Sequence, residues 1–345
     1  MAIRTSIHDL HAYVPGEQPK SADVLKLNTN ENPYPPSPKV LEALSALSSD
    51  DLRKYPDPSA QELREVLADV HDLSPDNFLV VNGSDEGLAL CTRCFCEHGG
   101  RVGYMKPSYS LYPVLSEIAE HQKVEYPLSE DFSWAVPEKV DVDLFFLTRP
   151  NAPTSLSLPK EDVFTLLERC PGTVLVDEAY AAFASDNVMD AVGKVDNLLV
   201  SRTFSKSHSL AGARVGYLAG PVRFIEALHK IRDSYNTDAV AQKMAIASLK
   251  DFSYTEKVTA TIRSTREQTW EKLSALGFTV LPSETNYLFA KVPEGKEAST
   301  IFDELKARNI FIRYFPGPLT GEYIRITMGT DLQMDRFLTE MKDLL

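Results

Sequence analysis

The chain has 345 residues, of which 43% are hydrophobic and 25% are charged. This is the composition of a folded globular protein, and it excludes wholesale disorder or a collagen-like repeat. The length exceeds what one hydrophobic core usually organises, so we expect a large domain and a smaller one. The net charge of −13 disfavours binding to nucleic acid or to an anionic membrane surface.

The first 40 residues predict an irregular arm. The segment LNTNENPYPPSP is rich in Pro, Asn and Ser, which favour turns over regular structure. We expect it to lie across a surface of the protein or on a partner subunit. The N-terminus lacks the apolar centre of a secretory signal, and no stretch reaches the length of an apolar membrane span, so we expect a cytoplasmic protein without a membrane segment.

The middle of the chain alternates short apolar runs with amphipathic stretches, a pattern typical of an α/β fold. Runs that do not alternate with polar residues suit strands buried on both faces, which favours a mostly parallel sheet flanked by helices. We expect strands at 78–81, 101–104, 143–147, 173–176, 197–201 and 214–220, and helices at 87–95, 158–170 and 221–233.

The pattern changes after about residue 238, which indicates a smaller α+β domain. A long helical stretch through Leu276 precedes expected strands at 278–281, 286–292, 310–313 and 323–328 and a helix at 297–307. The predicted division is therefore an arm at 1–40, a large domain at 41–240 and a small domain at 241–345.

Cysteine use gives little support to a metal site. The chain has four cysteines, and three of them lie in CTRCFC at 91–96. Zinc usually takes four ligands from two separated pairs, so we expect buried helix cysteines in a reducing compartment and no metal.

Three motifs could bind one ligand. In VNGSDEGLAL (81–90), a strand, a tight turn at Gly83 and a helix N-terminus would form an anion site, because free amides and the helix dipole converge there. The alternative is ordinary helix capping by Ser84. In TVLVDEAYAAF (173–183), Asp177 ends an apolar strand, at the edge where open α/β sheets bind ligands. The alternative is an exposed strand end.

The third motif, SRTFSKSHSLAGARVGY (201–217), surrounds Lys206 with hydroxyl-bearing and small residues, and Arg202 and Arg214 flank it. Hydroxyl and guanidinium groups bind phosphate, and an amine near cations has a depressed pKa and becomes a nucleophile. A solvated surface lysine is the alternative. Together the motifs predict a ligand with a phosphate, a protonated ring nitrogen and an aldehyde, and pyridoxal phosphate has all three.

The chain resembles the fold-type I pyridoxal-phosphate aminotransferases, and among them most closely the histidinol-phosphate aminotransferases. The resemblance runs over nearly the whole chain and is carried by LNTNENPYPPSP, RKYPDP, NGSDEG, PSYSLY, VDEAY, SRTFSKSHSLAGARVGY and YIRITMGT. It implies that Lys206 joins the cofactor's aldehyde and moves a proton, that Asp177 keeps the pyridine nitrogen protonated, and that Tyr180 binds the ring's phenolic oxygen.

The resemblance also implies the remaining site residues. Tyr109 would stack on the cofactor ring, and its phosphate would be held by Ser84, Asp85, Thr203, Ser205 and Arg214. Tyr55 would reach the cofactor phosphate of the other subunit, which implies a homodimer with shared active sites. Arg325 would bind the substrate's anionic group, with Arg313, Asn286, Asn30 and Tyr34 as further substrate-binding candidates; an exposed strand-end arginine or a turn residue is the alternative for these four.

One segment departs from the family pattern. Relatives commonly carry NPNNPTG where this chain has RPNAPTS at 149–155. Ala152 therefore replaces an asparagine that contacts the phenolic oxygen. Either Asn151 takes over that hydrogen bond, or Tyr180 acts with less help. Arg149 and Ser155 replace Asn and Gly in the same turn.

The resemblance implies transamination between a small-molecule amino donor and a keto acceptor, with histidinol phosphate and 2-oxoglutarate giving imidazole acetol phosphate and glutamate, a step of histidine biosynthesis. An aromatic amino-acid aminotransferase or a threonine-phosphate decarboxylase could use the same residues. A cofactor-binding regulatory domain without turnover and a structural α/β protein are the alternatives outside this class.

Overall fold

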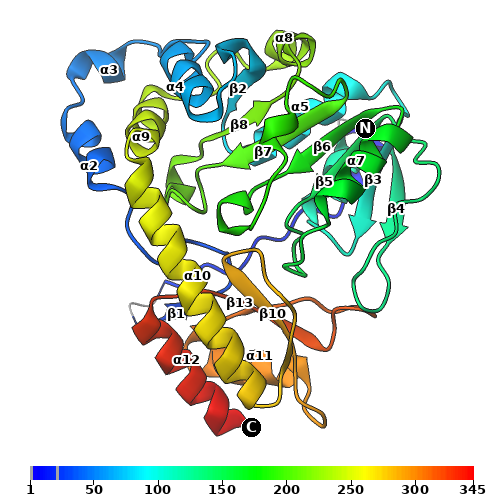
Figure 1. The fold of residues 1–345 in the computed structure, drawn as a ribbon, viewed down its shortest axis with the longest axis vertical. Helices are drawn as coiled ribbons and strands as arrows, with labels where there is room; N and C mark the ends of the chain where they lie inside the picture. Colours follow the sequence, from blue (N-terminus) through cyan, green and yellow to red (C-terminus); the bar gives the residue numbers. More distant parts are fainter. Residues whose placement is uncertain (1–2, 21–22) are drawn as a thin grey trace.

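The computed structural model describes residues 3–20 and 23–345. A large lobe is built on a seven-stranded sheet, and a second lobe lies beside it at the far end of the long helix α10 (Figure 1). The order in the large sheet is β2-β8-β7-β6-β5-β3-β4. Its strands are β2 (Phe78–Val81), β3 (Arg101–Lys106), β4 (Gln122–Pro127), β5 (Leu144–Thr148), β6 (Thr173–Asp177), β7 (Leu198–Thr203) and β8 (Gly216–Ala219).

The predicted mostly parallel sheet is confirmed. Strands β7, β6, β5, β3 and β4 run parallel, while β8 is antiparallel to both of its neighbours. The expected strands are all present within a few residues, but β4 was not predicted. Its residues QKVEYP are mostly exposed or half-buried, so this edge strand lacks the apolar run that marks the others.

Helices cover both faces of this sheet, because alternate residues of its strands point to opposite sides. In β5 and β6, Phe145 and Val174 belong to one core with α4, α7 and α9. Phe146 and Leu175 belong to the other core, with α5, α6 and α8. The helices are α1 (Thr5–His8), α2 (Pro38–Ser45), α3 (Ser49–Arg53), α4 (Gln61–His71), α5 (Ser84–Phe95), α6 (Leu111–Ile118), α7 (Lys160–Arg169), α8 (Val222–Ile231), α9 (Ala239–Leu249), α10 (Phe252–Ala275), α11 (Ala298–Ala307) and α12 (Asp331–Leu344).

The second lobe packs α10, α11 and α12 against a four-stranded sheet of order β12-β13-β10-β9 (Figure 1). A separate parallel pair joins β1 of the arm to β11, so part of the arm belongs structurally to this lobe. The exact domain boundaries remain a prediction. The strands are β1 (Leu25–Lys26), β9 (Thr279–Val280), β10 (Tyr287–Lys291), β11 (Ile310–Phe311), β12 (Arg313–Tyr314) and β13 (Tyr323–Thr327).

Two predicted elements of the second lobe are divided in the structure. The helical stretch after 238 is interrupted between α9 and α10, where the Asp251 carboxylate accepts a hydrogen bond from Ser37 and pairs with Lys39 at 3.4 Å. The expected strand at 310–313 is split at the buried Ile312 into β11 and β12, which join different sheets. Tertiary contacts thus override the local pattern in both places.

The parallel strands bring acidic and hydroxyl-bearing residues to the carboxyl edge of the large sheet. Asp177 ends β6, and it lies beside Thr148 at the end of β5 and beside Ser201 of β7. The arm and the second lobe close over this edge, and the pocket described below lies between them. Among the described residues, no helix is both long and apolar enough to span a bilayer.

Candidate active site

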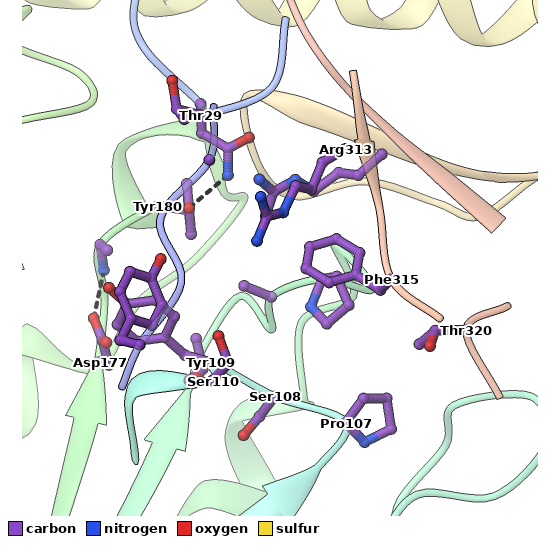
Figure 2. Close-up of a pocket in the computed structure, with 18 of the residues that line it drawn as sticks. Thr29, Pro107, Ser108, Tyr109, Ser110, Asp177, Tyr180, Arg313, Phe315 and Thr320 are labelled. Carbon is purple, nitrogen blue, oxygen red and sulfur yellow. Dashed lines mark hydrogen bonds between the residues drawn. The ribbon is translucent and has the colours of Figure 1, made fainter. Parts of the chain in front are cut away.

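A cavity of about 740 Å³ lies at the carboxyl edge of the sheet, between the two lobes. Figure 2 shows that its walls come from the arm, the large lobe and the second lobe. The predicted site residues that line it are Asn30, Ser84, Asp85, Tyr109, Asp177, Tyr180, Thr203, Ser205, Lys206, Arg214, Arg313 and Arg325.

Lys206 lies in the turn that follows β7, and its side chain reaches into the cavity. Its Nζ donates a 3.1 Å hydrogen bond to the carbonyl oxygen of Thr29 in the arm. Burial and the nearby Arg325 guanidinium lower the pKa of Lys206 to about 8. The amine is therefore a partly deprotonated nucleophile near neutral pH, and it is not the solvated surface lysine of the alternative interpretation.

Asp177 is buried at the end of β6, with 3% of its surface exposed, so the alternative of an exposed strand end is wrong. Its Oδ2 accepts a 3.0 Å hydrogen bond from Tyr112 Oη, and its Oδ1 accepts one of 3.2 Å from the backbone amide of Ala179. Burial raises the pKa of Asp177 to about 6. A carboxylate in this position binds a cationic or proton-bearing group favourably.

Sequence reasoning missed Tyr112, the side-chain donor to Asp177. It lies on α6 three residues after Tyr109, and the two rings meet edge to face with centroids 5.6 Å apart. Tyr109 precedes the N-cap Ser110, and Tyr112 lies in the first turn of α6, where its amide donates to the Tyr109 carbonyl oxygen at 3.2 Å. A second tyrosine three residues after Tyr109 was the available signal.

The turn before α5 forms the predicted anion site. Gly83 has a φ of +74° and is the N-cap of α5, and no side chain of the described residues caps the helix. Ordinary capping by Ser84 is therefore wrong, and the amides of the first turn remain available. A Cβ at Gly83 would lie 2.5 Å from Nη2 of Arg214, and one at Gly216 would lie 2.9 Å from the amide nitrogen of Ser84.

Charged and hydroxyl groups complete this corner of the cavity. Arg214 pairs with Asp85 at 3.2 Å, and Tyr109 Oη donates to the same carboxylate at 3.3 Å. Thr203 Oγ1 donates to Ser205 Oγ at 2.9 Å. Arg202, which the motif placed beside the lysine, instead pairs with buried Glu178 at 2.7 Å and is not part of the lining.

Tyr180 follows β6, lines the cavity and is 8% exposed. Its hydroxyl oxygen accepts a 2.7 Å hydrogen bond from Nδ2 of Asn30 in the arm, and Figure 2 shows this bond beside the cavity. The ring packs edge to face on Tyr287, with centroids 5.2 Å apart. Burial raises the pKa of Tyr180, so the phenol is protonated and can donate a hydrogen bond.

The segment 149–155 gives the cavity only Ala152 and Pro153. The amide of Asn151 does not line the cavity; it donates to the carbonyl oxygen of Pro107 at 3.2 Å and to Thr154 Oγ1 at 2.9 Å. Arg149 and Ser155, which replace Asn and Gly of the family pattern, form hydrogen bonds within the fold. Buried Arg149 donates to the carbonyl oxygen of Leu158 at 2.7 Å, and Ser155, at a φ of +68°, donates to that of Pro282 at 3.1 Å.

Two arginines from the second lobe line the cavity. The guanidinium carbons of Arg325 and Arg313 lie 5.1 Å and 5.5 Å from the ring centroid of Phe315. Arg325 donates to the carbonyl oxygen of Asn28 at 2.8 Å, and its buried Nε has no hydrogen-bond partner among the described residues. Burial and the Arg325 charge lower the pKa of Arg313. Such a cationic pair favours an anionic ligand.

Four predicted site residues do not line the cavity. Asn151 is one of them. Asn286 is buried behind the arm, where its Nδ2 donates to the carbonyl oxygen of Asn30 at 3.0 Å. Tyr34 packs against the core of the second lobe. Tyr55 is 80% exposed and stacks on Tyr235 with centroids 4.4 Å apart, away from this cavity.

The cysteines of CTRCFC lie away from this chemistry. Cys91 and Cys94 are on α5, and Cys91 is fully buried while Cys94 and Cys96 are half-buried. Among residues 3–20 and 23–345, no cluster of three or more His, Cys, Asp or Glu side chains could hold a metal ion.

We compared the chain with protein families, curated proteins and solved structures. The profile of the family described as "Aminotransferase class I and II" matches residues 22–341. The chain is a member of this family. Among curated proteins, histidinol-phosphate aminotransferases from Syntrophotalea carbinolica and Geobacter sulfurreducens are each 41% identical, over 99% and 100% of this chain and 99% of each relative.

A solved structure gives the same family and fold. The crystal structure of histidinol-phosphate aminotransferase from Sinorhizobium meliloti in complex with pyridoxal-5'-phosphate has a TM-score of 0.88 to this chain, with 26% identity over 99% of this chain and 97% of that one. The predicted aminotransferase family and the predicted fold type are thus confirmed. Family membership makes this chain an aminotransferase, and the structural alternative without enzymatic activity is wrong.

Proposed function

We propose that this aminotransferase binds pyridoxal phosphate in the cavity between its lobes and transfers an amino group from histidinol phosphate to 2-oxoglutarate. The observation that carries the proposal is the meeting of Lys206, Asp177 and the turn at 83–85 around one cavity. The relatives that share most of this chain bear the name of that activity.

The residues present fit the cofactor. The uncapped first turn of α5, Arg214 and the hydroxyls of Thr203 and Ser205 are donors suited to a phosphate. A side chain at Gly83 or Gly216 would fill this cradle. Asp177, buried with a raised pKa, suits a protonated ring nitrogen at the other end. Pyridoxal phosphate supplies an electron sink that makes the substrate's carbon–hydrogen bond acidic.

Lys206 and Asp177 would divide the chemistry. The Lys206 amine, whose pKa burial and Arg325 lower to about 8, would bind the cofactor's aldehyde and then move a proton at the substrate carbon. The Asp177 carboxylate would hold the ring nitrogen in its protonated form, and Tyr112 orients this carboxylate from the side away from the cavity.

Three aromatic or hydroxyl side chains would position the ring. Tyr109 lines the cavity beside the anion corner and offers a face for stacking. Tyr180 is protonated and would donate to the ring's phenolic oxygen. Tyr13 of the arm meets Tyr109 edge to face at 5.9 Å and helps to exclude water from this side.

Arg325 and Arg313 would bind the anionic end of the substrate. Two guanidiniums around Phe315 suit a phosphate dianion, because each can form paired hydrogen bonds with its oxygens. A 2-oxo acid acceptor would offer a carboxylate to the same groups. This dual use explains how one pocket accepts a donor and an acceptor of different shape.

A panel of amino donors tests the proposal. The enzyme is assayed with 2-oxoglutarate and histidinol phosphate, phenylalanine, tyrosine or threonine phosphate, and carbon dioxide release is followed in parallel. We expect histidinol phosphate to have the highest kcat/KM by about tenfold or more, which is about 1.4 kcal/mol of transition-state discrimination. A better aromatic donor, carbon dioxide release or cofactor binding without turnover would each replace the proposal with the matching alternative.

We also propose that two copies of the chain form a homodimer with shared sites, as the resemblance implies for Tyr55. Tyr55 and Tyr235 form an exposed stacked pair, and Leu41 and Leu52 nearby in sequence are 55% and 67% exposed. Such side chains are typical of interfaces. Mixing inactive Lys206→Ala with Tyr55→Ala tests this, because a mixed dimer rebuilds one site with both residues. Activity restored on mixing supports shared sites, whereas simple addition of the separate activities contradicts them.

The cytoplasm is the compartment we propose. All four cysteines are free thiols, as a reducing environment would keep them. Fractionation of cells that express the chain tests this, and recovery with the cytoplasmic fraction is expected.

A further inference from the structure

The wall of the cavity beside Tyr180 lacks a polar side chain from the segment 149–155. Only Ala152 and Pro153 of this segment line the cavity, and neither carries a polar side-chain atom. The nearest amide, that of Asn151, is already bonded to Pro107 and Thr154. Segment 149–155 therefore offers the ring oxygen no side-chain donor, whereas the protonated hydroxyl of Tyr180 lies on this wall and can donate to it.

Asn30 of the arm is the donor in its hydrogen bond with Tyr180. Nδ2 of Asn30 donates to the Tyr180 hydroxyl oxygen at 2.7 Å, while Oδ1 of Asn30 accepts a 2.9 Å hydrogen bond from Thr327 Oγ1. The backbone amide of Asn30 donates to the same Thr327 oxygen at 3.1 Å. The Thr327 hydroxyl accepts one of these bonds and donates the other, and in this arrangement the amide NH₂ of Asn30 faces Tyr180.

The backbone of Asn30 is also held firmly. Its φ is +56°, a left-handed conformation that asparagine tolerates better than most residues. Nδ2 of Asn286 donates to its carbonyl oxygen at 3.0 Å. Asn30 and its contacts with Thr327 and Asn286 are buried.

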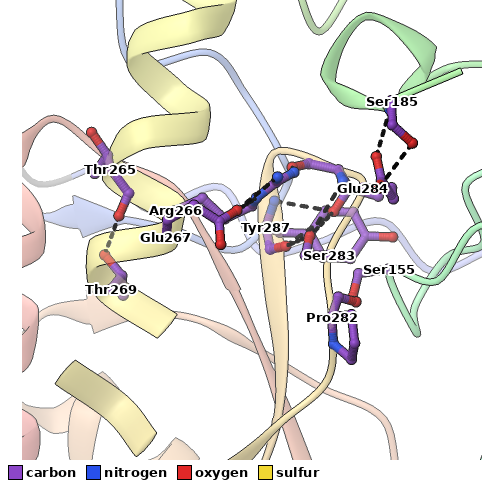
Figure 3. A network of polar contacts seen from close by, with 11 residues as sticks. Ser155, Ser185, Thr265, Arg266, Glu267, Thr269, Pro282, Ser283, Glu284 and Tyr287 are labelled. Atoms are coloured by element: carbon purple, nitrogen blue, oxygen red, sulfur yellow. Dashed lines mark hydrogen bonds and ion pairs between the residues drawn. The ribbon is translucent and has the colours of Figure 1, made fainter. Parts of the chain in front are cut away.

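The loop that carries Asn286 is fixed by both lobes, as Figure 3 shows. Arg266 of α10 donates to the carbonyl oxygen of Thr285 at 2.8 Å, and Ser155 of the large lobe donates to that of Pro282 at 3.1 Å. Glu284 accepts a 2.6 Å hydrogen bond from the Ser185 amide. The position of Asn30 therefore depends on a rigid junction and not on the arm alone.

This arrangement determines where the Tyr180 proton points. An oxygen that accepts from Asn30 keeps its own hydrogen free for another acceptor, and hydrogen bonds in such a chain strengthen one another. The bond from Asn30 stabilises negative charge on the tyrosine oxygen and so opposes the effect of burial on the Tyr180 pKa. The hydroxyl becomes a better donor toward the cavity.

We propose that Asn30 is a positioning residue that strengthens the hydrogen bond from Tyr180 to the phenolic oxygen of the cofactor, and that it supplies from the arm the support that segment 149–155 does not give. This inference rests on the proposed function, since it concerns the same bound cofactor. It assigns Asn30 a role through Tyr180 and not through the substrate.

The test uses the cofactor-loaded protein and follows its near-visible absorbance as a function of pH. Asn30→Gly removes the amide without straining the left-handed backbone, and Asn30→Asp keeps the shape but has no NH₂ group. Each is made alone and together with Tyr180→Phe. Thermal unfolding of every variant reports whether the fold is intact.

We expect Asn30→Gly and Asn30→Asp to raise the pH midpoint of the absorbance change by about 0.5 unit, the size that one weakened hydrogen bond supports. A weaker bond from Tyr180 leaves more negative charge on the ring oxygen, which stabilises the protonated nitrogen linked to Lys206. In the Tyr180→Phe background Asn30→Gly should leave the midpoint unmoved, whereas Asn30→Asp should keep only the upward shift that its added carboxylate causes. Thr327→Val, which frees the Asn30 amide to rotate, should give a smaller shift in the same direction.

Several results would overturn the inference. An unchanged midpoint in Asn30→Gly, or an equal shift by Asn30→Gly with and without the Tyr180 hydroxyl, shows that Asn30 does not act through Tyr180. An unchanged midpoint in Thr327→Val shows that its hydroxyl does not orient the amide. If the unsubstituted protein forms no near-visible absorbance with pyridoxal phosphate, the proposed function fails instead, so the two failures are distinguishable.

Discussion

The hydroxyl of Tyr112 donates a 3.0 Å hydrogen bond to Oδ2 of Asp177, and both side chains are buried. The two residues lie on different elements, α6 and β6, and meet only because α6 packs on this face of the sheet. The pair holds a carboxylate where, without a cationic ligand, it is unfavourable in its charged form.

Asp177 should therefore destabilise the cofactor-free protein at neutral pH. Its folded pKa of about 6 lies above the ordinary 3.8, so its contribution to stability is complete below pH 3.8 and is lost as the pH rises to about 6. We expect cofactor-free Asp177→Asn to exceed the unsubstituted protein in free energy of unfolding by about 2 kcal/mol at pH 8, but not near pH 4.

Urea unfolding at the two pH values measures this difference. Asp190→Asn is the matched control, because its partner Lys160 lowers the pKa of Asp190, and its loss should not stabilise the protein at pH 8. Equal stability of Asp177→Asn and the unsubstituted protein at pH 8 would contradict the expected effect of burial. With the cofactor bound, Asp177→Asn should slow turnover more than it weakens cofactor binding.

Alanine substitutions at Gly83 and Gly99 distinguish the cost of backbone strain from the loss of cofactor phosphate binding. Their φ values are +74° and +75°, but a Cβ at Gly83 would lie 2.5 Å from Arg214 Nη2, whereas one at Gly99 would meet no atom of the described part of the chain within 4 Å. Both alanine substitutions should cost about 1 kcal/mol of stability.

Only Gly83→Ala should weaken cofactor binding, by about tenfold or more, because the guanidinium of Arg214 must move away and a charged hydrogen bond is lost. Equilibrium titration with pyridoxal phosphate, followed by absorbance, measures the affinity of both variants. Equal affinities would show that Arg214 does not hold the phosphate.

Arg313 and Arg325 can be examined with donors that differ by one phosphate. Loss of one charged contact should lower kcat/KM for histidinol phosphate about tenfold or more in Arg313→Gln and in Arg325→Gln. Arg313→Gln should change kcat/KM for unphosphorylated histidinol much less. Arg308→Gln is the control, since Arg308 pairs with Glu340 outside the cavity; an equal loss for both donors in Arg313→Gln would argue against a phosphate contact.

The depressed pKa of Lys206 should control the uptake of the cofactor. The amine reacts only when it is deprotonated, so the rate of cofactor uptake should increase with pH to a plateau, with a midpoint near the pKa of about 8. Arg325 is one cause of the lowered pKa of Lys206, so Arg325→Gln should move the midpoint upward.

Stopped-flow absorbance of the cofactor-free protein mixed with pyridoxal phosphate gives this profile. Arg308→Gln should leave the midpoint in place, and Lys206→Ala should show neither the near-visible absorbance nor turnover. A midpoint that does not change in Arg325→Gln would contradict a contribution of Arg325 to the lowered pKa of Lys206.

Much of the fold was predictable because its signals are local. The strands predicted at 143–147 and 173–176 became β5 and β6, since strands buried on both faces need uninterrupted apolar residues. Edge strand β4 lacks that signal and was missed. The division of 310–313 between two sheets could not be predicted, because it depends on which distant strands, β1 and β13, pair with each half.

The identities of Lys206, Asp177 and the 83–85 turn follow from the chain alone, because each motif joins a strand end to a particular chemical group and needs no distant contact to be recognised. Tertiary structure alone decided their partners. The Tyr112 hydroxyl on Asp177, the Thr29 carbonyl on Lys206 and the Asn30 amide on Tyr180 come from segments up to 177 residues away. Hydrogen bonds of this kind depend on directions in space, and a linear pattern does not record those directions.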